Sequence, residues 1–169
     1  MEGFEGKTAV VIGGTGGIGL EIVNMLLFNG ACVIIHGRDK KKLDDLSLKL
    51  EKNYPQRVKT VQFDFYKENF LDIEKSLLNQ NVKKADILCV CFGPFLQKEL
   101  EHMDAQEWHK VSVLNYALPG LLISSCLENM KAHRWGRILL FGGTGTNFRT
   151  EFLTNTAYAG AKSGLGVLV

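Results

Sequence analysis

Short apolar runs rich in β-branched residues recur along the chain, and each is followed by a segment in which apolar residues have helical spacing. The runs cover residues 8–12, 31–36, 58–63, 85–90 and 137–141. Continuous apolar runs of this length are typical of strands that are covered on both faces, as in a parallel sheet. The strict alternation therefore predicts an α/β fold, a doubly wound parallel sheet with right-handed crossovers and helices on both faces.

The segments between the runs predict five helices, and their polar residues indicate where these begin and end. Asp39 is a candidate N-cap, and Asp104 followed by Glu107 has the spacing of a capping box. Pro119 lies inside the fourth helix and predicts a kink with a missing backbone hydrogen bond. The helices are expected from about residue 17 to 27, from residue 39 to before Pro55, and over 68–79, 104–131 and 156–169.

A glycine cluster ends the first run and precedes the first helix. Gly13, Gly17 and Gly19 are spaced as Gly-x-x-x-Gly-x-Gly. Glycines let a backbone turn tightly and approach a phosphate closely, and the free N–H groups of the following helix start stabilise negative charge. The pattern indicates a cradle for a dinucleotide pyrophosphate and a Rossmann-type fold. The alternative is a tight turn that binds no ligand.

Composition narrows the function classes. The 169 residues predict one domain, residues 1–169, with 46% hydrophobic residues, 22% charged residues and a net charge of +2. That charge is too small to indicate nucleic-acid binding, and Lys40-Lys41-Lys42 suits a solvated helix start. We expect no signal peptide, no membrane span and no metal site, and reduced thiols at the four cysteines, which together indicate a cytoplasmic protein.

Tyr158 and Lys162 are four residues apart in the last predicted helix, so both side chains lie on one helix face. A free tyrosine has a pKa near ~10 and is a poor acid or base at neutral pH. A nearby ammonium stabilises the phenolate and brings that pKa toward the working range. The pair is therefore a candidate proton-transfer site, although a packed tyrosine beside a surface lysine gives the same spacing.

Taken together, these motifs resemble the short-chain dehydrogenase/reductase family along essentially the whole chain. The matching segments are Gly13 to Gly19, Asp64, Asp86-Ile87-Leu88, Asn115, Gly136-Arg137-Ile138 and the pair Tyr158 and Lys162. The resemblance implies that Tyr158 is the general acid/base, that Lys162 holds the nicotinamide ribose, and that Asn115 supports a proton relay. It implies cofactor contacts at Gly13, Thr15, Gly16, Gly17, Ile18, Gly19, Arg38, Asp64, Phe65, Gly93, Asn115, Tyr158 and Lys162.

The residue after the second strand bears on the choice of cofactor. Members that use NAD(H) resemble one another in having an acid there, where this chain has Gly37. Arg38 follows, and a guanidinium suits a 2′-phosphate by charge and by bidentate geometry. We therefore expect NADP(H) rather than NAD(H).

Three departures from the family pattern matter. The Asn-Asn-Ala-Gly segment of relatives is Val90-Cys91-Phe92-Gly93 here, and Gly143 stands at the position of the catalytic serine. Thr144 is the candidate replacement, because its hydroxyl can donate to a carbonyl as a serine does; Thr146 lies just beyond. Relatives also continue past the catalytic helix, so the last strands are expected to be missing from this chain. A fragment, an interrupted reading frame and cover by another chain are the alternatives.

The leading hypothesis is an oxidoreductase that transfers hydride between NADP(H) and a small-molecule carbonyl or secondary alcohol. The second is a dinucleotide-binding module without turnover, and the third is a structural or partner-binding remnant. The resemblance also implies a homo-oligomer that pairs through the long fourth helix and the catalytic helix.

Overall fold

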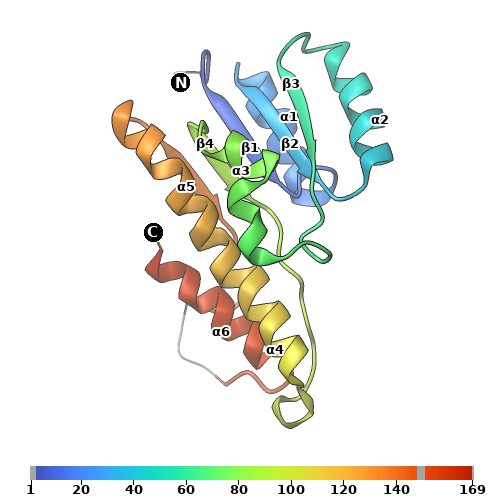
Figure 1. Ribbon diagram of the computed structural model, residues 1–169, viewed down its shortest axis with the longest axis vertical. Coiled ribbons are helices and arrows are strands. Elements are labelled where there is room, and N and C mark those ends of the chain that lie inside the picture. Colours follow the sequence, from blue (N-terminus) through green and yellow to red (C-terminus); the bar gives the residue numbers. More distant parts are fainter. Residues whose placement is uncertain (1–2, 148–150, 169) are drawn as a thin grey trace. The chain divides into compact units, whose positions relative to one another are not determined.

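Five strands form one sheet in the order β3-β2-β1-β4-β5 in the computed structural model, which describes residues 3–147 and 151–168. Parallel pairing joins β1 to β2 and to β4, and β2 to β3 (Figure 1). The strands are β1 (Thr8–Ile12), β2 (Cys32–Gly37), β3 (Val58–Gln62), β4 (Ile87–Val90) and β5 (Arg137–Leu140). The predicted parallel α/β sheet is confirmed.

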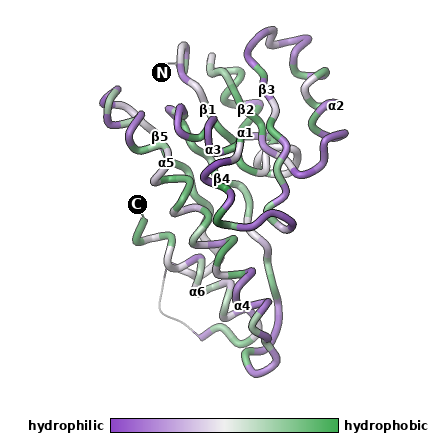
Figure 2. Tube along the Cα trace, viewed as in Figure 1, coloured by the Kyte–Doolittle hydropathy of each residue, from purple (hydrophilic) through white to green (hydrophobic). Residues whose placement is uncertain are grey.

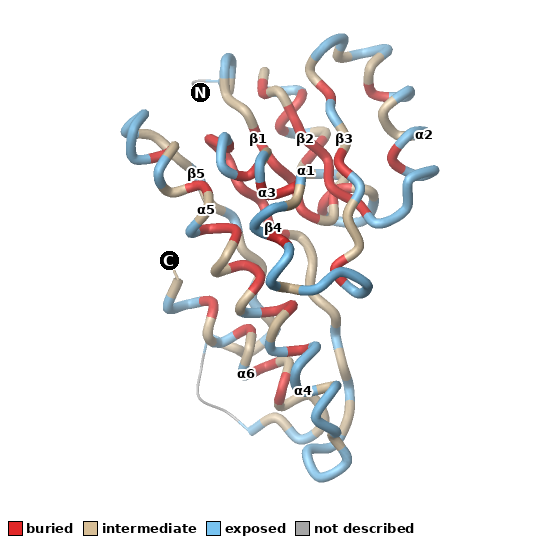
Figure 3. Tube along the Cα trace, viewed as in Figure 1, coloured by how far each residue is buried: buried red, intermediate tan, exposed pale blue. Residues whose placement is uncertain are grey.

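Both faces of the central strands are buried, which explains why these runs are apolar throughout. On one face, Ala9, Val11 and Ile35 join a core cluster with residues of the first two helices. The residues between them, such as Val10 and Ile34, point to the other face and are buried as well. Figures 2 and 3 show the same central strands as hydrophobic and buried. Burying each large aliphatic side chain contributes roughly 1.5–3 kcal/mol.

Six α-helices and several short helical turns connect the strands in the described part of the chain. The α-helices are α1 (Gly17–Phe28), α2 (Lys40–Glu51), α3 (Leu77–Val82), α4 (Ala105–Ser112), α5 (Leu118–Ala132) and α6 (Thr156–Gly164). The 3₁₀ turns are Phe70–Lys75, Leu100–His102 and Leu165–Val167, and Val113–Ala117 is a π-helical turn.

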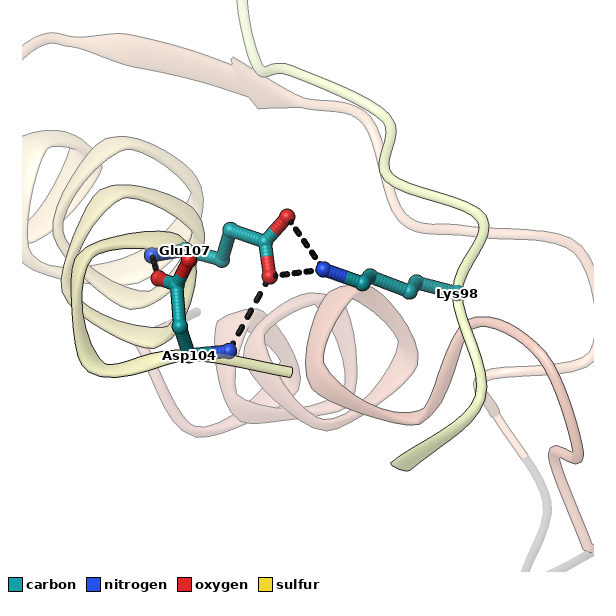
Figure 4. A network of polar contacts seen from close by, with 3 residues as sticks. All are labelled: Lys98, Asp104 and Glu107. Atoms are coloured by element: carbon teal, nitrogen blue, oxygen red, sulfur yellow. Dashed lines mark hydrogen bonds and ion pairs between the residues drawn. The ribbon is translucent and has the colours of Figure 1, made fainter. Parts of the chain in front are cut away.

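Both predicted helix caps are present. The Asp39 carboxylate accepts the N–H of Lys42 at 3.1 Å and so begins α2. At the start of α4, Asp104 and Glu107 form a reciprocal capping box, in which each side chain accepts the other's backbone N–H. Lys98 adds its ammonium to both Glu107 oxygens, at 2.9 Å and 2.7 Å (Figure 4). These contacts satisfy N–H groups that would otherwise lack partners.

The helix predicted over 68–79 is wrong as one continuous element. Asn69 caps the 3₁₀ turn by accepting the N–H of Leu71, and Ser76 then caps α3 by accepting the N–H of Asn79. Each capping residue has extended backbone angles, which interrupt a helix. The final helix is also shorter than predicted, since α6 ends at Gly164 and the 3₁₀ turn follows; Val169 lies outside the described residues.

The helix predicted over 104–131 divides into α4, the π-helical turn and α5. In the π-helical turn the N–H of Leu118 donates to the carbonyl of Val113, five residues back. Pro119 follows at once, and it has no N–H to give to the carbonyl of Asn115 four residues before it. The expected disturbance near Pro119 therefore takes the form of a wide turn that contains Asn115.

One helical stretch is long and apolar enough to cross a bilayer, when judged by length and composition alone. Residues Ala105–Ala132 include an 18-residue window with a mean hydropathy of 1.3, of which 44% is buried within the protein. Core helices of globular domains commonly meet the same criteria.

The chain divides into two compact units. The first unit comprises residues 1–91 and 122–139 and includes the strand core with α1, α2 and α3. The second unit comprises residues 92–121 and 140–169 and includes α4, the π-helical turn and α6. Within the second unit, α6 packs against α4 and against the π-helical turn (Figure 1).

Candidate active site

The glycine turn of the first unit needs glycine at several positions. Gly13 and Gly17 have φ values of +79° and +52°, in the left-handed region that other residues rarely adopt. A Cβ at Gly19 would lie 2.3 Å from the carbonyl oxygen of Gly13, so this contact of helix and turn excludes any side chain. The spacing that the sequence analysis singled out therefore follows from backbone geometry.

The start of α1 presents N–H groups that no side chain caps. Gly16 is the N-cap residue and makes no side-chain hydrogen bond, and the first turn of α1 contains no acidic residue. A Cβ at Gly16 or Gly17 would meet nothing within 4 Å, so the backbone is open there. Free N–H groups at an open helix start are what an anionic pyrophosphate requires, and the turn therefore fits this group.

His36 is a site residue that the sequence analysis missed. It lies at the end of β2 and is buried, and its Nδ1 accepts the N–H of Gly13 at 3.2 Å. Its carbonyl accepts the N–H of Gly14 at 3.0 Å, so one residue holds two successive amides of the turn. Burial lowers the pKa of His36 to about 4, against the opposing effects of its bond to Phe63 and of the Asp64 charge. The available signal was a lone histidine in an otherwise apolar run.

The residues around Arg38 lie beside the turn in the same unit. A Cβ at Gly37 would lie 2.5 Å from Cγ2 of Thr15, so an acidic side chain has no room there. Arg38 is exposed, and its guanidinium lies over the ring of Tyr66, with Cζ 5.6 Å from the ring centroid. The carboxylate of Asp39 is bound to the start of α2. Because the Asp39 carboxylate is engaged there, the exposed guanidinium of Arg38 is available to bind an anion.

Asp64 and Phe65 follow β3 and have different environments. Asp64 accepts the N–H of Tyr66 at 3.1 Å, and the ammonium of Lys67 lies 3.8 Å from its carboxylate. Phe65 is buried, and its ring lies 4.8 Å from the His36 ring, between centroids. The carboxylate of Asp64 is therefore accessible to a ligand. The side chain of Phe65 packs in the interior, so only its backbone could contact a ligand.

In the second unit, the π-helical turn holds Asn115 completely buried. Its Nδ2 donates to the carbonyls of Pro94 at 2.9 Å and Val111 at 3.1 Å, which fixes the orientation of the amide. Its Oδ1 is buried and has no hydrogen-bond partner among the described residues. Buried polar atoms are nearly always paired, so this oxygen is an acceptor that suits a ligand or a water molecule.

Tyr158 and Lys162 lie on one face of α6, as predicted. The ammonium of Lys162 is 5.8 Å from the centroid of the Tyr158 ring, and the ring of Phe95 packs edge-on against Tyr158 at 5.0 Å. Burial raises the pKa of Tyr158, and burial lowers the pKa of Lys162. The expected lowering of the Tyr158 pKa is therefore not seen in the chain alone, because burial disfavours the charged phenolate.

Gly93 brings these groups together. A Cβ at Gly93 would lie 2.3 Å from Oδ1 of Asn115 and 3.1 Å from Nζ of Lys162. Both polar groups therefore approach the backbone of this one residue, and only glycine leaves them room. Gly93 is the glycine of the family segment that this chain otherwise lacks.

The loop that should hold the catalytic hydroxyl is organised by Thr146 rather than by Thr144. A Cβ at Gly143 would lie 2.8 Å from Cγ2 of Thr146 and 3.1 Å from Cε1 of Tyr158, so Thr146 fills the space beside the serine position. Oγ1 of Thr146 accepts the N–H of Gly143 at 3.0 Å and donates to its carbonyl at 2.8 Å. Thr144 is exposed; its role remains a prediction.

The predicted residues thus form two groups, one in each unit. Gly13 to Gly19, Arg38, Asp64 and Phe65 lie in the first unit, and Gly93, Asn115, Tyr158 and Lys162 lie in the second. In the second group, Asn115 and Lys162 meet at Gly93, while Tyr158 and Thr146 meet at Gly143.

Two curated relatives are similar in sequence to this chain. A very-long-chain 3-oxoacyl-CoA reductase of Candida albicans is 28% identical over 94% of this chain, which spans 48% of that relative. A 3-oxoacyl-(acyl-carrier-protein) reductase of Aquifex aeolicus is 26% identical over 91% of this chain, which spans 64% of it. The chain therefore spans about half of the first relative's length and just under two thirds of the second's.

A solved structure shares the fold. It is a 3-oxoacyl-(acyl-carrier-protein) reductase of Agrobacterium tumefaciens with NADP bound, 23% identical, with a TM-score of 0.83 over 99% of this chain and 63% of that one. The family model described as short chain dehydrogenase matches residues 7–169. The chain belongs to the short-chain dehydrogenase family.

Proposed function

We propose that the chain binds NADP(H) and reduces a carbonyl to a secondary alcohol, with 3-oxoacyl thioesters as the substrate class. The observation that carries the proposal is the cluster in the second unit, in which Asn115, Tyr158 and Lys162 gather around Gly93 and Gly143. Tyr158 can act as the acid or base, Lys162 is a buried ammonium, and the unpaired Oδ1 of Asn115 can accept a hydrogen bond. Together these three groups suit proton transfer to a substrate.

Proton transfer at the carbonyl oxygen falls to Tyr158. When bound, the nicotinamide supplies the hydride, and the phenol of Tyr158 gives its proton to the developing alkoxide. Tyr158 is half-buried, and the ring of Phe95 covers one edge of its ring. A raised pKa keeps the hydroxyl protonated at neutral pH, which suits reduction more than the reverse reaction.

Lys162 and Asn115 prepare that transfer. The buried ammonium of Lys162 has a lowered pKa because its charged form is desolvated, and hydrogen bonds to ribose hydroxyls would satisfy it. The unpaired Oδ1 of Asn115 would accept from a water molecule that returns a proton to Tyr158.

The hydroxyl that polarises the substrate carbonyl is assigned to Thr146. Its side chain occupies the space beside Gly143, where relatives have serine. The hydrogen bond that it gives to the Gly143 carbonyl would be redirected to the substrate. Thr144 is the competing candidate, and its exposure is the argument against it.

The proposed preference for NADP(H) over NAD(H) rests on the residues at the end of β2, Gly37 and Arg38. Gly37 and Thr15 leave no space for the carboxylate that would bind a ribose 2′-hydroxyl, and Arg38 offers a planar cation. The substrate class is taken from the names of the two relatives, both of which reduce 3-oxoacyl groups by name.

Cofactor titration tests the binding half of the proposal. Nicotinamide fluorescence measures the Kd of NADPH and of NADH for the wild-type chain and for Arg38→Ala. Loss of hydrogen bonds to a charged phosphate raises the NADPH Kd by about tenfold or more, whereas the NADH Kd stays constant. An equal rise in the Kd of NADPH and of NADH would show that Arg38 does not bind the 2′-phosphate. A wild-type chain that binds neither cofactor contradicts the proposal.

A dinucleotide-binding module without turnover is the second candidate. Gly143 at the serine position favours it, because glycine offers no hydroxyl to the substrate carbonyl. The two candidates separate in one assay: NADPH binding with no oxidation of NADPH by a 3-oxoacyl thioester supports the module, and substrate-dependent oxidation supports the reductase.

A further inference from the structure

The His36 side chain bridges two segments that a dinucleotide would contact. Its Nδ1 accepts the N–H of Gly13 in the glycine turn, at 3.2 Å. Its Nε2 lies 3.0 Å from the carbonyl oxygen of Phe63, the residue before Asp64. The ring is 3% exposed and packs at 4.8 Å against Phe65.

These partners determine the state of the ring. An N–H donor faces Nδ1, so Nδ1 must be the unprotonated nitrogen, and Nε2 then carries the hydrogen and donates it to Phe63. A second proton on Nδ1 would set two N–H groups against each other. The contacts therefore require the neutral ring in its Nε2–H form.

The same residue also holds the turn through its backbone. The His36 carbonyl accepts from Gly14, while Ile12 pairs with His36 in the register of β1 and β2. His36 thus occupies the N–H groups of both Gly13 and Gly14. The later amides of the turn, at Gly16 and beyond, are left to face a ligand.

We propose that His36 is a positioning residue for the dinucleotide: its Nδ1 holds the amide of Gly13 and so fixes the phosphate turn, while the bond from Nε2 to the carbonyl of Phe63 keeps the ring in the Nε2–H form that leaves Nδ1 free to accept. This inference rests on the proposed function, because it assumes that the turn binds a pyrophosphate. It assigns to β2 a role in binding the phosphates, in addition to the role of Arg38 at the ribose.

Three substitutions separate the two ring bonds. His36→Asn places an acceptor near the position of Nδ1 and keeps the Gly13 bond, His36→Gln places a donor near the position of Nε2 and keeps the Phe63 bond, and His36→Phe keeps only the packing. Val58→Ala is the matched control, since Val58 is buried at the opposite end of the adjacent strand and its truncation destabilises the sheet without touching the turn.

The measurement is the Kd of NADPH and of 2′,5′-ADP, taken well below each variant's Tm. His36→Asn is expected to bind both probes within about twofold of the wild type, and His36→Gln and His36→Phe about fivefold to tenfold more weakly, the size of one hydrogen bond. Val58→Ala lowers Tm and leaves both Kd values unchanged. Unchanged Kd values in His36→Gln and His36→Phe, or a loss in His36→Asn equal to that in His36→Phe, would overturn the proposal.

A measurement on the wild-type chain tests the proposal even if the His36 variants fail to fold. ¹⁵N NMR of labelled histidine reports the tautomer, and amide exchange reports the protection of the Gly13 N–H. A neutral Nε2–H ring with a protected Gly13 amide supports the assignment, and an Nδ1–H ring or an unprotected amide overturns it. A wild-type chain that binds neither probe contradicts the proposed function, whereas the NMR result still decides whether His36 holds the turn.

Discussion

At the scale of single residues, the candidate site depends on glycines, whose lack of a side chain leaves space for neighbouring functional groups. Gly93 and Gly143 make room for Asn115, Lys162 and Tyr158, because a Cβ at either position would overlap those side chains. The sequence predicts the glycine turn and the pair on α6 because their spacing is local. It does not predict that His36 and Thr146 hold these groups, because their hydrogen-bond partners are set by the folded backbone.

Gly93→Ala tests the close approach of these groups. The added methyl would meet Oδ1 of Asn115 at 2.3 Å, and we expect the unfolding free energy to fall by about 1–3 kcal/mol. Gly160→Ala is the matched control, since Gly160 is an exposed residue of α6 where a Cβ meets nothing within 4 Å, and it should stabilise the chain by roughly 0.5–1 kcal/mol. Urea unfolding measures both; equal effects would show that Gly93 is not crowded.

Replacing each threonine of the loop identifies the catalytic hydroxyl. Thr146→Val keeps the shape of the side chain and removes the hydroxyl that bonds the Gly143 backbone. We expect kcat for carbonyl reduction to fall by about tenfold or more, with a smaller effect for Thr144→Val. A larger loss in Thr144→Val would return the role to Thr144.

At the scale of elements, strands are easier to predict than helix boundaries. β1 was predicted with its observed bounds and the other strands within two residues, because the central strands β1, β2 and β4 are buried along nearly their whole length and are therefore mostly apolar. The helix over 68–79 was mispredicted because Ser76, read as a helix-interior residue, is the cap of α3. The π-helical turn was predicted only as a kink. Pro119 indicates that a backbone hydrogen bond is missing, but it does not indicate which conformation the backbone takes in response.

The capping network of α4 predicts an acid-sensitive contribution to the stability of the second unit. Hydrogen bonds from Lys98 and Asp104 lower the pKa of Glu107 below its usual value of 4.5. A lowered pKa stabilises the fold above the unfolded-state value, and this contribution is lost as the pH falls through the folded-state value. Glu107→Gln should therefore lower Tm at pH near ~7 and have little effect at pH near ~3. The exposed Glu101→Gln is the control, and a Tm difference that persists in acid would contradict this assignment.

At the scale of the whole molecule, His36 makes stability depend on pH in a window where few groups titrate. Its pKa is about 4 in the folded chain and near ~6.5 when unfolded, so the unfolded state binds more protons between these values. The unfolding free energy therefore decreases as the pH falls below about 6.5, by a total of roughly 3 kcal/mol at pH near 4. Unfolding curves at several pH values measure the slope, and His36→Asn should flatten it. An unchanged slope in that variant would assign the effect to other groups.

Carbonyl reduction by this chain with Tyr158 as the acid can be measured as single-turnover oxidation of bound NADPH by a 3-oxoacyl thioester. Tyr158→Phe should lower the rate by about 10²–10⁴-fold while NADPH affinity is retained. Tyr116→Phe is the matched control, because Tyr116 is a half-exposed tyrosine whose ring packs on Gly164. An oxidation rate that Tyr158→Phe leaves unchanged would contradict the account.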